Sequence, residues 1–259
     1  MQRQLLQTPG NFFYNLFIIL LIIIIVVAAY FFLLNPSAIS PIMQDFRPVD
    51  FGEAVGLREP NPSHILFDET FDTNTGIWTL SPPDQARFFG GGLLLDDNQF
   101  NSHAGAQLGL SFDNFLLKVN TRWVGGSIGG GYGVRFRQSS DSSFYAFYLH
   151  NDGRYTIGRQ IRTESNWVEF TNAYSDAINT SGGVNAIQIE VIGTQMRFFV
   201  NGEFLAAFED DRLGIGDVEL VSVKAENTEQ YMAGFDNLQI YQLFEDAVPE
   251  PEGTVSSEE

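Results

Sequence analysis

Carboxylate and imidazole groups are the side chains of this sequence that could carry out acid–base chemistry. The acidic residues gather in three short groups, which lie at the ends of predicted strands or in turns: Asp68-Glu69, Asp96-Asp97 and Glu209-Asp210-Asp211. The three histidines (His64, His103 and His150) are scattered, and no serine or aspartate stands near them in the pattern of a catalytic triad. These residues therefore indicate no catalytic group.

Aromatic side chains on loops are candidates for ligand binding, because they can stack on the apolar faces of sugars. We predict a ligand-binding set of four aromatic residues with an asparagine as hydrogen-bonding neighbour: Trp78, Tyr132, Asn166, Trp167 and Tyr174. The alternative is that Trp78 and Trp167 are core or corner residues, as a β-sandwich commonly requires.

Asp236 is the carboxylate whose surroundings the sequence predicts best. If the last strand is regular, Asp236 shares a face with Leu238 and Ile240, which should point inward. A carboxylate near the edge of a core needs hydrogen bonds or a cation. The alternatives are that it caps a turn through backbone N–H groups, or that a bulge turns it to solvent.

The composition narrows the class of protein. A formal net charge of −18 in 259 residues argues against a nucleic-acid partner, because no basic patch is present to bind phosphates. The absence of cysteine excludes disulfides and thiolate chemistry. Abundant aromatic residues and glycine, with 24 Phe, 9 Tyr and 25 Gly, suit an all-β domain with many tight turns.

From residue 64 onward, short runs rich in Phe, Val, Ile and Tyr alternate with clusters of turn residues. The turn clusters Asn151-Asp152-Gly153, Gly193-Thr194-Gln195 and Asn201-Gly202 predict β-hairpins. No segment of this region has the 3.6-residue period of a helix. We predict an antiparallel, all-β domain of two stacked sheets.

A family resemblance rests on five stretches of this region: Leu66–Phe71 with Trp78, Phe144–Phe147, Met196–Gly202, Gly216–Leu220 and Phe235–Tyr241. Together they resemble the concanavalin A-like jelly rolls, above all the laminin-G-like domains of bacterial surface proteins. The resemblance covers residues 64–243 and implies a concanavalin A-like β-sandwich. Because this fold carries lectins, glycosidases and spacer domains, it does not by itself imply an activity.

The resemblance also implies where a catalytic or metal site would lie. Related β-glucanases carry the pattern Glu-x-Asp-x-x-Glu on one strand, which is missing here, so we predict that the protein is not an enzyme. Hydrolases of keto-sugars share a similar fold, which keeps a glycan-acting hydrolase as an alternative. Related jelly rolls often hold a structural Ca²⁺ between the first and last strands, which implies Asp68, Glu69 and Asp236 as metal ligands. No cofactor is required.

The stretch 12–34 is uncharged and apolar, and it is long enough to span a bilayer core of about 30 Å. It exceeds the apolar region of a signal peptide and lacks a small-residue cleavage site at its end. Arg3 precedes it and Arg47 is the first basic residue after it. The positive-inside rule then predicts a single-pass cell-membrane protein with a cytoplasmic N-terminus (1–11) and an extracytoplasmic domain.

Two further segments flank the domain. Residues 35–63 form a linker with five prolines, whose apolar residues Phe46, Val49 and Phe51 could pack along the domain or on a neighbouring protein. Residues 244–259 form an acidic tail that we predict to be disordered.

We therefore predict a membrane-anchored, non-catalytic binding module that recognises a glycan or cell-envelope polymer. The alternative is an accessory subunit of a larger membrane complex, in which the span and the linker contact partner proteins.

Overall fold

The computed structural model describes residues 58, 60–98, 103–164, 167–226 and 228–244. The chain divides into two compact units, Met1–Asp45 and Phe46–Glu259, and all described residues belong to the second. The predicted N-terminus (1–11), membrane helix (12–34) and most of the linker and tail lie outside the described residues. Within the described part of the chain, no helix has the length and apolar character needed to cross a membrane.

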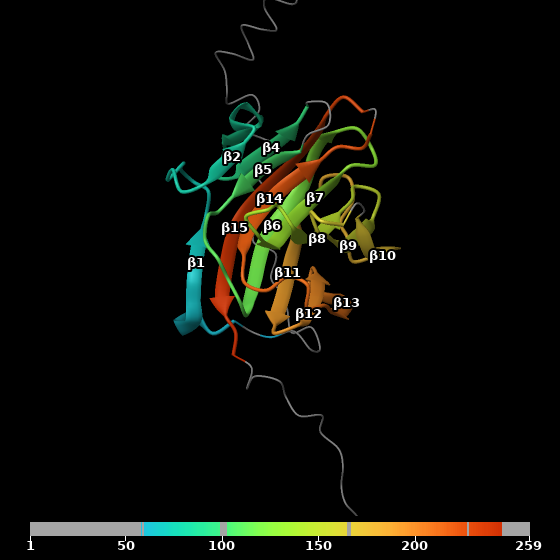
Figure 1. The fold of residues 1–259 in the computed structure, drawn as a ribbon. Coiled ribbons are helices and arrows are strands. Elements are labelled where there is room, and N and C mark those ends of the chain that lie inside the picture. Colours follow the sequence, from blue (N-terminus) through green and yellow to red (C-terminus); the bar gives the residue numbers. More distant parts are fainter. Residues whose placement is uncertain (1–57, 59, 99–102, 165–166, 227, 245–259) are drawn as a thin grey trace, which may run out of the picture. The chain divides into compact units, whose positions relative to one another are not determined.

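Two antiparallel sheets make up the domain (Figure 1). The eight-stranded sheet has the order β13-β12-β11-β6-β15-β4-β3, and β1 also pairs with β15. Its strands are β1 (Ile65–Glu69), β3 (Ala86–Phe88), β4 (Leu93–Asp97), β6 (Phe115–Gly126), β11 (Asn185–Ile192), β12 (Gln195–Val200), β13 (Glu203–Glu209) and β15 (Tyr231–Gln242).

The seven-stranded sheet has the order β10-β9-β8-β7-β14-β5-β2. Its strands are β2 (Thr79–Ser81), β5 (Ala104–Gln107), β7 (Gly131–Gln138), β8 (Phe144–Leu149), β9 (Arg154–Gln160), β10 (Val168–Tyr174) and β14 (Asp217–Val223). Two short 3₁₀ helices, η2 (Pro62–His64) and η3 (Pro83–Gln85), are the helical elements of the described residues. The prediction of an all-β, two-sheet domain is confirmed.

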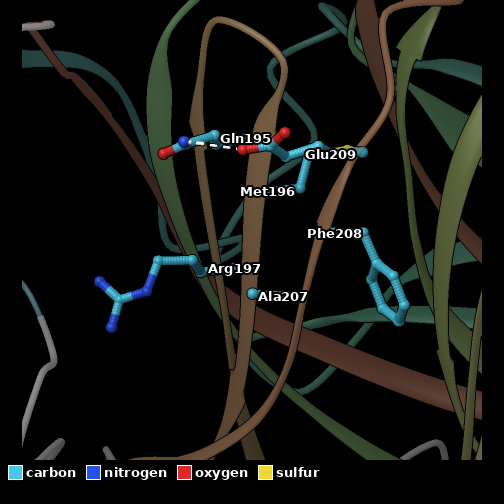
Figure 2. Close-up of a pocket in the computed structure, with 6 residues that line it drawn as sticks. All are labelled: Gln195, Met196, Arg197, Ala207, Phe208 and Glu209. Atoms are coloured by element: carbon cyan, nitrogen blue, oxygen red, sulfur yellow. Dashed lines mark hydrogen bonds between the residues drawn. The ribbon is translucent and has the colours of Figure 1, made fainter.

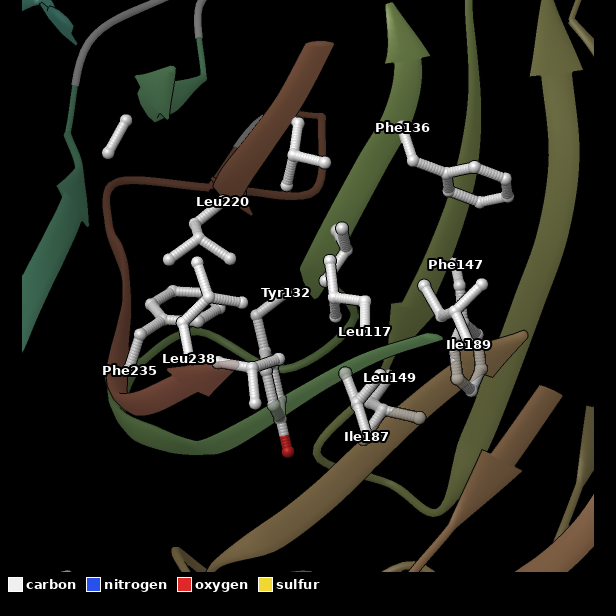
Figure 3. Packing of buried hydrophobic residues seen from close by; sticks show 14 of the residues in the cluster. Leu117, Tyr132, Phe136, Phe147, Leu149, Ile187, Ile189, Leu220, Phe235 and Leu238 are labelled. Atoms are coloured by element: carbon white, nitrogen blue, oxygen red, sulfur yellow. The ribbon is translucent and has the colours of Figure 1, made fainter. Parts of the chain in front are cut away.

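The core lies between the sheets and is built from alternate residues of each strand. Leu117, Ile187 and Leu238 of the eight-stranded sheet face Phe147 and Leu220 of the seven-stranded sheet (Figure 3). All five side chains are buried. Because side chains alternate along a strand, the intervening residues point away from this core onto the outer faces of the sheets.

The predicted hairpins are confirmed, since each follows from local turn chemistry. Asn201 and Gly202 join β12 to β13 with φ values of +51° and +84°, as a two-residue type I′ turn requires. Residues 151–153 join β8 to β9, and the turn at Gly193 joins β11 to β12.

The last strand, in contrast, is not regular. Asn237 has a φ of +50°, and the pairing of β15 with β6 shifts register between Asp236 and Gln239. The extra residue changes the alternation, so that Phe235 and Leu238 both lie in the core while Asp236 points to the opposite face. The prediction that Asp236 shares a face with Leu238 and Ile240 is therefore wrong, and the bulge is the reason.

Candidate functional site

The outer face of the seven-stranded sheet carries a group of charged side chains at its centre. Glu219 on β14 lies directly opposite Arg135 on β7 in the strand register. Leu220 and Val134, their neighbours in sequence, belong to the core. Alternation therefore places Glu219 and Arg135 on the outer face, next to each other.

Hydrogen bonds connect these two residues to His103 and Tyr148. Glu219 Oε2 lies 3.1 Å from Arg135 Nη1, and Glu219 Oε1 lies 3.1 Å from His103 Nε2. Arg135 Nη1 also lies 2.9 Å from His103 Nε2, and Arg135 Nε donates to the Tyr148 hydroxyl at 2.8 Å. The four residues form one connected polar network, in which His103 is a third exposed.

The network keeps both central groups charged at neutral pH. Burial alone would raise the pKa of Glu219, but the hydrogen bond from His103 and the charge of Arg135 outweigh it and lower the pKa. Burial alone would lower the pKa of Arg135, and the interactions with Tyr148 and Glu219 reverse that effect. Glu219 is thus an ionised carboxylate rather than a proton donor.

Aromatic rings surround the network on the same face. The guanidinium carbon of Arg135 lies 4.4 Å from the centre of the Phe144 ring, a cation–π contact. The rings of Tyr148 and Trp167 stack with centroids 6.2 Å apart and an interplanar angle of 20°. The face therefore combines flat apolar surfaces with charged hydrogen-bonding groups, as ligand sites commonly do.

Two glycines make room for these side chains. A Cβ atom at Gly158 on β9 would come within 2.5 Å of the Trp167 ring, and one at Gly105 on β5 would come within 2.4 Å of Glu219 Oε1. The absence of a side chain lets Trp167 lie on the backbone of β9 and lets Glu219 lie against β5.

Asp217 is the second carboxylate at the start of β14, and its role is structural. It accepts hydrogen bonds from the backbone N–H groups of Gly109, Leu110 and Val218 and from the Gln107 amide. These bonds fix the loop that follows β5. Asp217 and Glu219 are thus both occupied by intramolecular partners.

The predicted ligand-binding residues are spread over different parts of the domain. Trp78 and Tyr132 are core residues with 6% and 0% exposure. Tyr174 is 71% exposed at the end of the edge strand β10, and Asn166 lies outside the described residues. Of the predicted set, the structure brings Trp167 to the charged network.

Sequence reasoning missed the residues that form this network, namely His103, Arg135, Phe144, Tyr148 and Glu219. The alternation of β7, β8 and β14 contains a signal. Core residues occupy every second position of these strands, and Arg135, Tyr148 and Glu219 occupy positions between them. The sequence contains no local pattern that joins them, because Glu219 lies 84 positions after Arg135 in the chain and His103 lies 32 positions before it.

The predicted calcium ligands all have protein partners. Glu69 accepts from the Phe71 N–H at 2.9 Å and the Trp78 indole at 3.3 Å, and Asp68 accepts from the Gln239 amide at 3.3 Å. Asp236 accepts from Asn237, and burial together with the charge of Asp72 raises its pKa to about 6. Among the described residues, no group of three or more acidic or histidine side chains could hold a metal ion. The calcium site stays a prediction.

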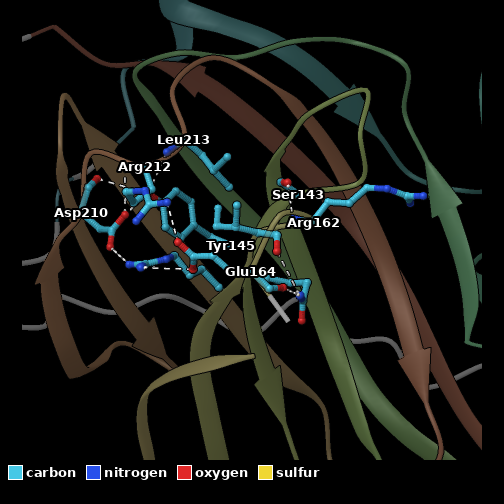
Figure 4. Close-up of polar contacts among 10 residues, drawn as sticks. Ser143, Tyr145, Arg162, Glu164, Asp210, Arg212 and Leu213 are labelled. Carbon is cyan, nitrogen blue, oxygen red and sulfur yellow. Dashed lines mark hydrogen bonds and ion pairs between the residues drawn. The ribbon is translucent and has the colours of Figure 1, made fainter. Parts of the chain in front are cut away.

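Two other polar features of the described residues are structural. A pocket beside the β12–β13 hairpin is lined by Gln195, Met196, Arg197, Ala207, Phe208 and Glu209 (Figure 2), and the Gln195 amide donates to Glu209 at 2.9 Å. Its two charged residues have protein partners, since Arg197 donates to Glu190 and Glu209 accepts from Gln195. Figure 4 shows the second feature, in which Asp210 accepts from the Tyr145 hydroxyl and from Arg159. These bonds connect the loop after β13 to β8 and β9.

No family model matches the chain, and no curated protein matches it. Solved structures do match in fold. A carbohydrate-binding module, CBM66 from Bacillus subtilis, is similar with a TM-score of 0.53 and 12% identity over 64% of this chain and 96% of its own. A Bacillus licheniformis β-glucanase is similar with a TM-score of 0.53 and 10% identity over 71% of this chain and 100% of its own. A Crh5 transglycosylase in complex with NAG is similar with a TM-score of 0.57 and 9% identity over 69% of this chain and 84% of its own.

These comparisons confirm the concanavalin A-like jelly-roll fold, and at 9–12% identity they show the fold alone. They also overturn the prediction that the protein is not an enzyme. That prediction rested on a missing sequence pattern, whereas the similar structures are mainly glucanases and transglycosylases, with a binding module among them. The narrower resemblance to laminin-G-like surface domains stays a prediction.

Proposed function

We propose that this protein recognises a glycan, and that the glycan lies on the outer face of the seven-stranded sheet. The observation that carries the proposal is the placement of the Arg135–Glu219–His103 network beside the stacked rings of Tyr148 and Trp167. The fold, shared with a carbohydrate-binding module and with glucanases, supports the same class of ligand.

The chemistry of the face suits a sugar. Arg135 and Glu219 stay charged and hold the imidazole of His103, which is a third exposed and can hydrogen-bond a hydroxyl group of a neutral sugar. The Trp167 ring offers a flat apolar surface for the C–H face of a pyranose or furanose ring. Because Arg135 and Glu219 neutralise each other, the network favours a neutral ligand over a strongly charged one.

Cleavage of the bound glycan is the second candidate function. The observation that favours it is Glu219, an ionised carboxylate at the centre of the face, with the imidazole Nε2 of His103 at 3.1 Å. An ionised carboxylate can serve as nucleophile or base, and a histidine can transfer a proton.

The test is a glycan array probed with the full-length protein and two variants. Trp167→Ala removes the ring on the proposed face, whereas Phe204→Ala removes an exposed ring from β13 of the other sheet. We expect the parent protein and the Phe204→Ala variant to bind one class of glycan. The Trp167→Ala variant should not bind that class. Equal binding by all three proteins would contradict the proposed face. Release of reducing ends from the bound glycan, abolished by Glu219→Gln, would establish cleavage.

We further propose that residues 12–34 anchor the protein in the cell membrane, with the N-terminus in the cytoplasm and the β domain outside. The support is the uncharged length of this stretch and the position of Arg3 before it. Extraction of native membranes at alkaline pH tests the anchor, and protease protection tests the orientation. Proteins that co-purify at a fixed ratio in mild detergent would instead identify the partners of an accessory subunit.

A further inference from the structure

The outer face of the eight-stranded sheet is polar and nevertheless buried. Lys118 and Asn120 on β6 and Gln188 and Glu190 on β11 alternate with core residues and therefore point away from the core. Their exposed fractions are 5%, 3%, 1% and 2%. Charged and amide side chains on the outer face of a two-layer sandwich are normally solvated, so this face is covered.

The cover does not come from an element that the structure describes. β11, β6 and β15 are neighbours in the middle of the eight-stranded sheet (Figure 1). The other described strands lie either beside them in the same sheet or in the opposite sheet, so none of them lies over this outer face. Apolar residues on the same outer face are buried as well: Leu94 on β4, Leu116 on β6 and Phe199 on β12. The covering segment must therefore contact both apolar and charged side chains.

The chain itself enters the domain on this face. The backbone N–H of Arg58 donates to Glu190 Oε1 at 3.2 Å, and Arg58 Nε lies 3.5 Å from Glu190 Oε2. Glu190 is held from the other side by Arg197 at 2.9 Å. The first described residue is thus fixed on the outer surface of β11, and the residues before it must start from that point.

We propose that residues 46–57, the segment that leads into Arg58, cover the outer face of the eight-stranded sheet. The segment reads FRPVDFGEAVGL. Phe46, Val49 and Phe51 are apolar and would suit the apolar part of the face. Asp50 and Glu53 would supply charges of opposite sign to Lys118 and Arg122 of β6. The compact unit that contains the sandwich also begins at Phe46.

The length of the segment agrees with this role. Twelve residues reach up to about 40 Å when extended. Neighbouring strands are about 4.8 Å apart, so the distance from β11 across β6 and β15 to β4 is only about 15 Å.

Cysteine accessibility tests the proposal, because the chain has no native cysteine. The full-length protein receives a single cysteine by Gln188→Cys, on the covered face, or by Ile128→Cys, whose parent residue is 74% exposed, as a matched control. Each is labelled with a maleimide in the intact chain and in a chain lacking residues 46–57. In the intact chain we expect the cysteine at position 188 to react at least about ten times more slowly than the cysteine at position 128. In the chain lacking residues 46–57 we expect the two cysteines to react at similar rates.

A second variant keeps the experiment decisive if the deletion chain does not fold. Val49→Ser with Phe51→Ser removes apolar contacts from the segment while keeping its length, and it should raise the labelling rate of the cysteine at position 188 several-fold. Rapid labelling of that cysteine in the purified intact chain would overturn the proposal and assign the cover to a partner protein. Protection that persists in both the deletion and the double variant would overturn it too.

Discussion

Glu219 and Arg135 lie opposite each other on neighbouring strands, with 3.1 Å between Oε2 and Nη1, although 84 residues separate them in the sequence. This pair sets the chemistry of the outer face of the seven-stranded sheet, because each group keeps the other charged. Both side chains are nearly buried, so neither charge is well solvated without the other.

Removing the charge of Glu219 should therefore affect both stability and binding. In Glu219→Gln the guanidinium of Arg135 loses its counter-charge, and we expect a loss of about 3 kcal/mol in the free energy of unfolding. Glycan binding should fall at the same time. Thermal melts and calorimetric titrations of the full-length protein measure the two effects. Glu209→Gln changes an exposed carboxylate and is the control, with an expected change below about 1 kcal/mol.

Trp167 should contribute to binding far more than to folding. Its ring is half-buried against Tyr148, and Trp167→Ala should weaken glycan affinity by about tenfold or more while the melting temperature changes little. Tyr174→Ala serves as comparison, because this predicted ligand residue is exposed at the sheet edge. A larger loss of affinity in the Tyr174 variant would move the site to the edge strand β10.

The parts of the fold that the sequence predicts well are those with local causes. Asn201-Gly202 supplies two residues with positive φ, so the hairpin needs no information from the rest of the chain. β5, with the sequence AGAQ, has weak strand propensity, and its sequence alone predicts no strand. It is a strand because β14 and β2 pair with it on its two sides.

The candidate site has non-local causes, and for that reason the sequence indicates little of it. The bulge at Asn237 changes the direction of Asp236, and no alternation pattern shows where an extra residue enters. Trp78 and Trp167 look alike as loop aromatics, but Trp78 packs on Phe71 in the core, whereas Trp167 stacks on the outer-face residue Tyr148. The packing partner, rather than the residue type, decides the role of each ring.

Arg137 should be a structural residue whose loss destabilises one end of the domain. Its buried guanidinium donates to the backbone carbonyls of Leu213, Asp113 and Gly193, which belong to three different loops. Arg137→Met leaves these acceptors without the donor, and we expect a loss of about 3 kcal/mol in the free energy of unfolding. Chemical denaturation measures it. Arg87→Met removes a 58% exposed arginine and should cost less than about 1 kcal/mol, and equal losses in both variants would contradict the assigned role.

His150 should make the stability of the domain depend on pH below neutrality. Burial lowers its pKa from the ordinary 6.5, against the hydrogen bond to Gly130, which raises it. The Gly130 carbonyl can only accept, so Nδ1 carries the hydrogen and Nε2 accepts from the Thr156 hydroxyl at 2.9 Å. The folded protein thus holds a neutral ring that a proton would disturb.

The sign of the pH effect follows from the lowered pKa. Between pH 6.5 and the lower folded pKa, the unfolded chain binds a proton that the folded chain does not, so stability is full above pH 6.5 and falls with the pH below it. Melting temperatures of the parent, His150→Gln and the control His64→Gln between pH 8 and pH 5 test this. Between pH 6.5 and pH 5 the melting temperature should fall less in His150→Gln than in the parent and in His64→Gln. An equal fall in all three proteins would refute the neutral buried ring.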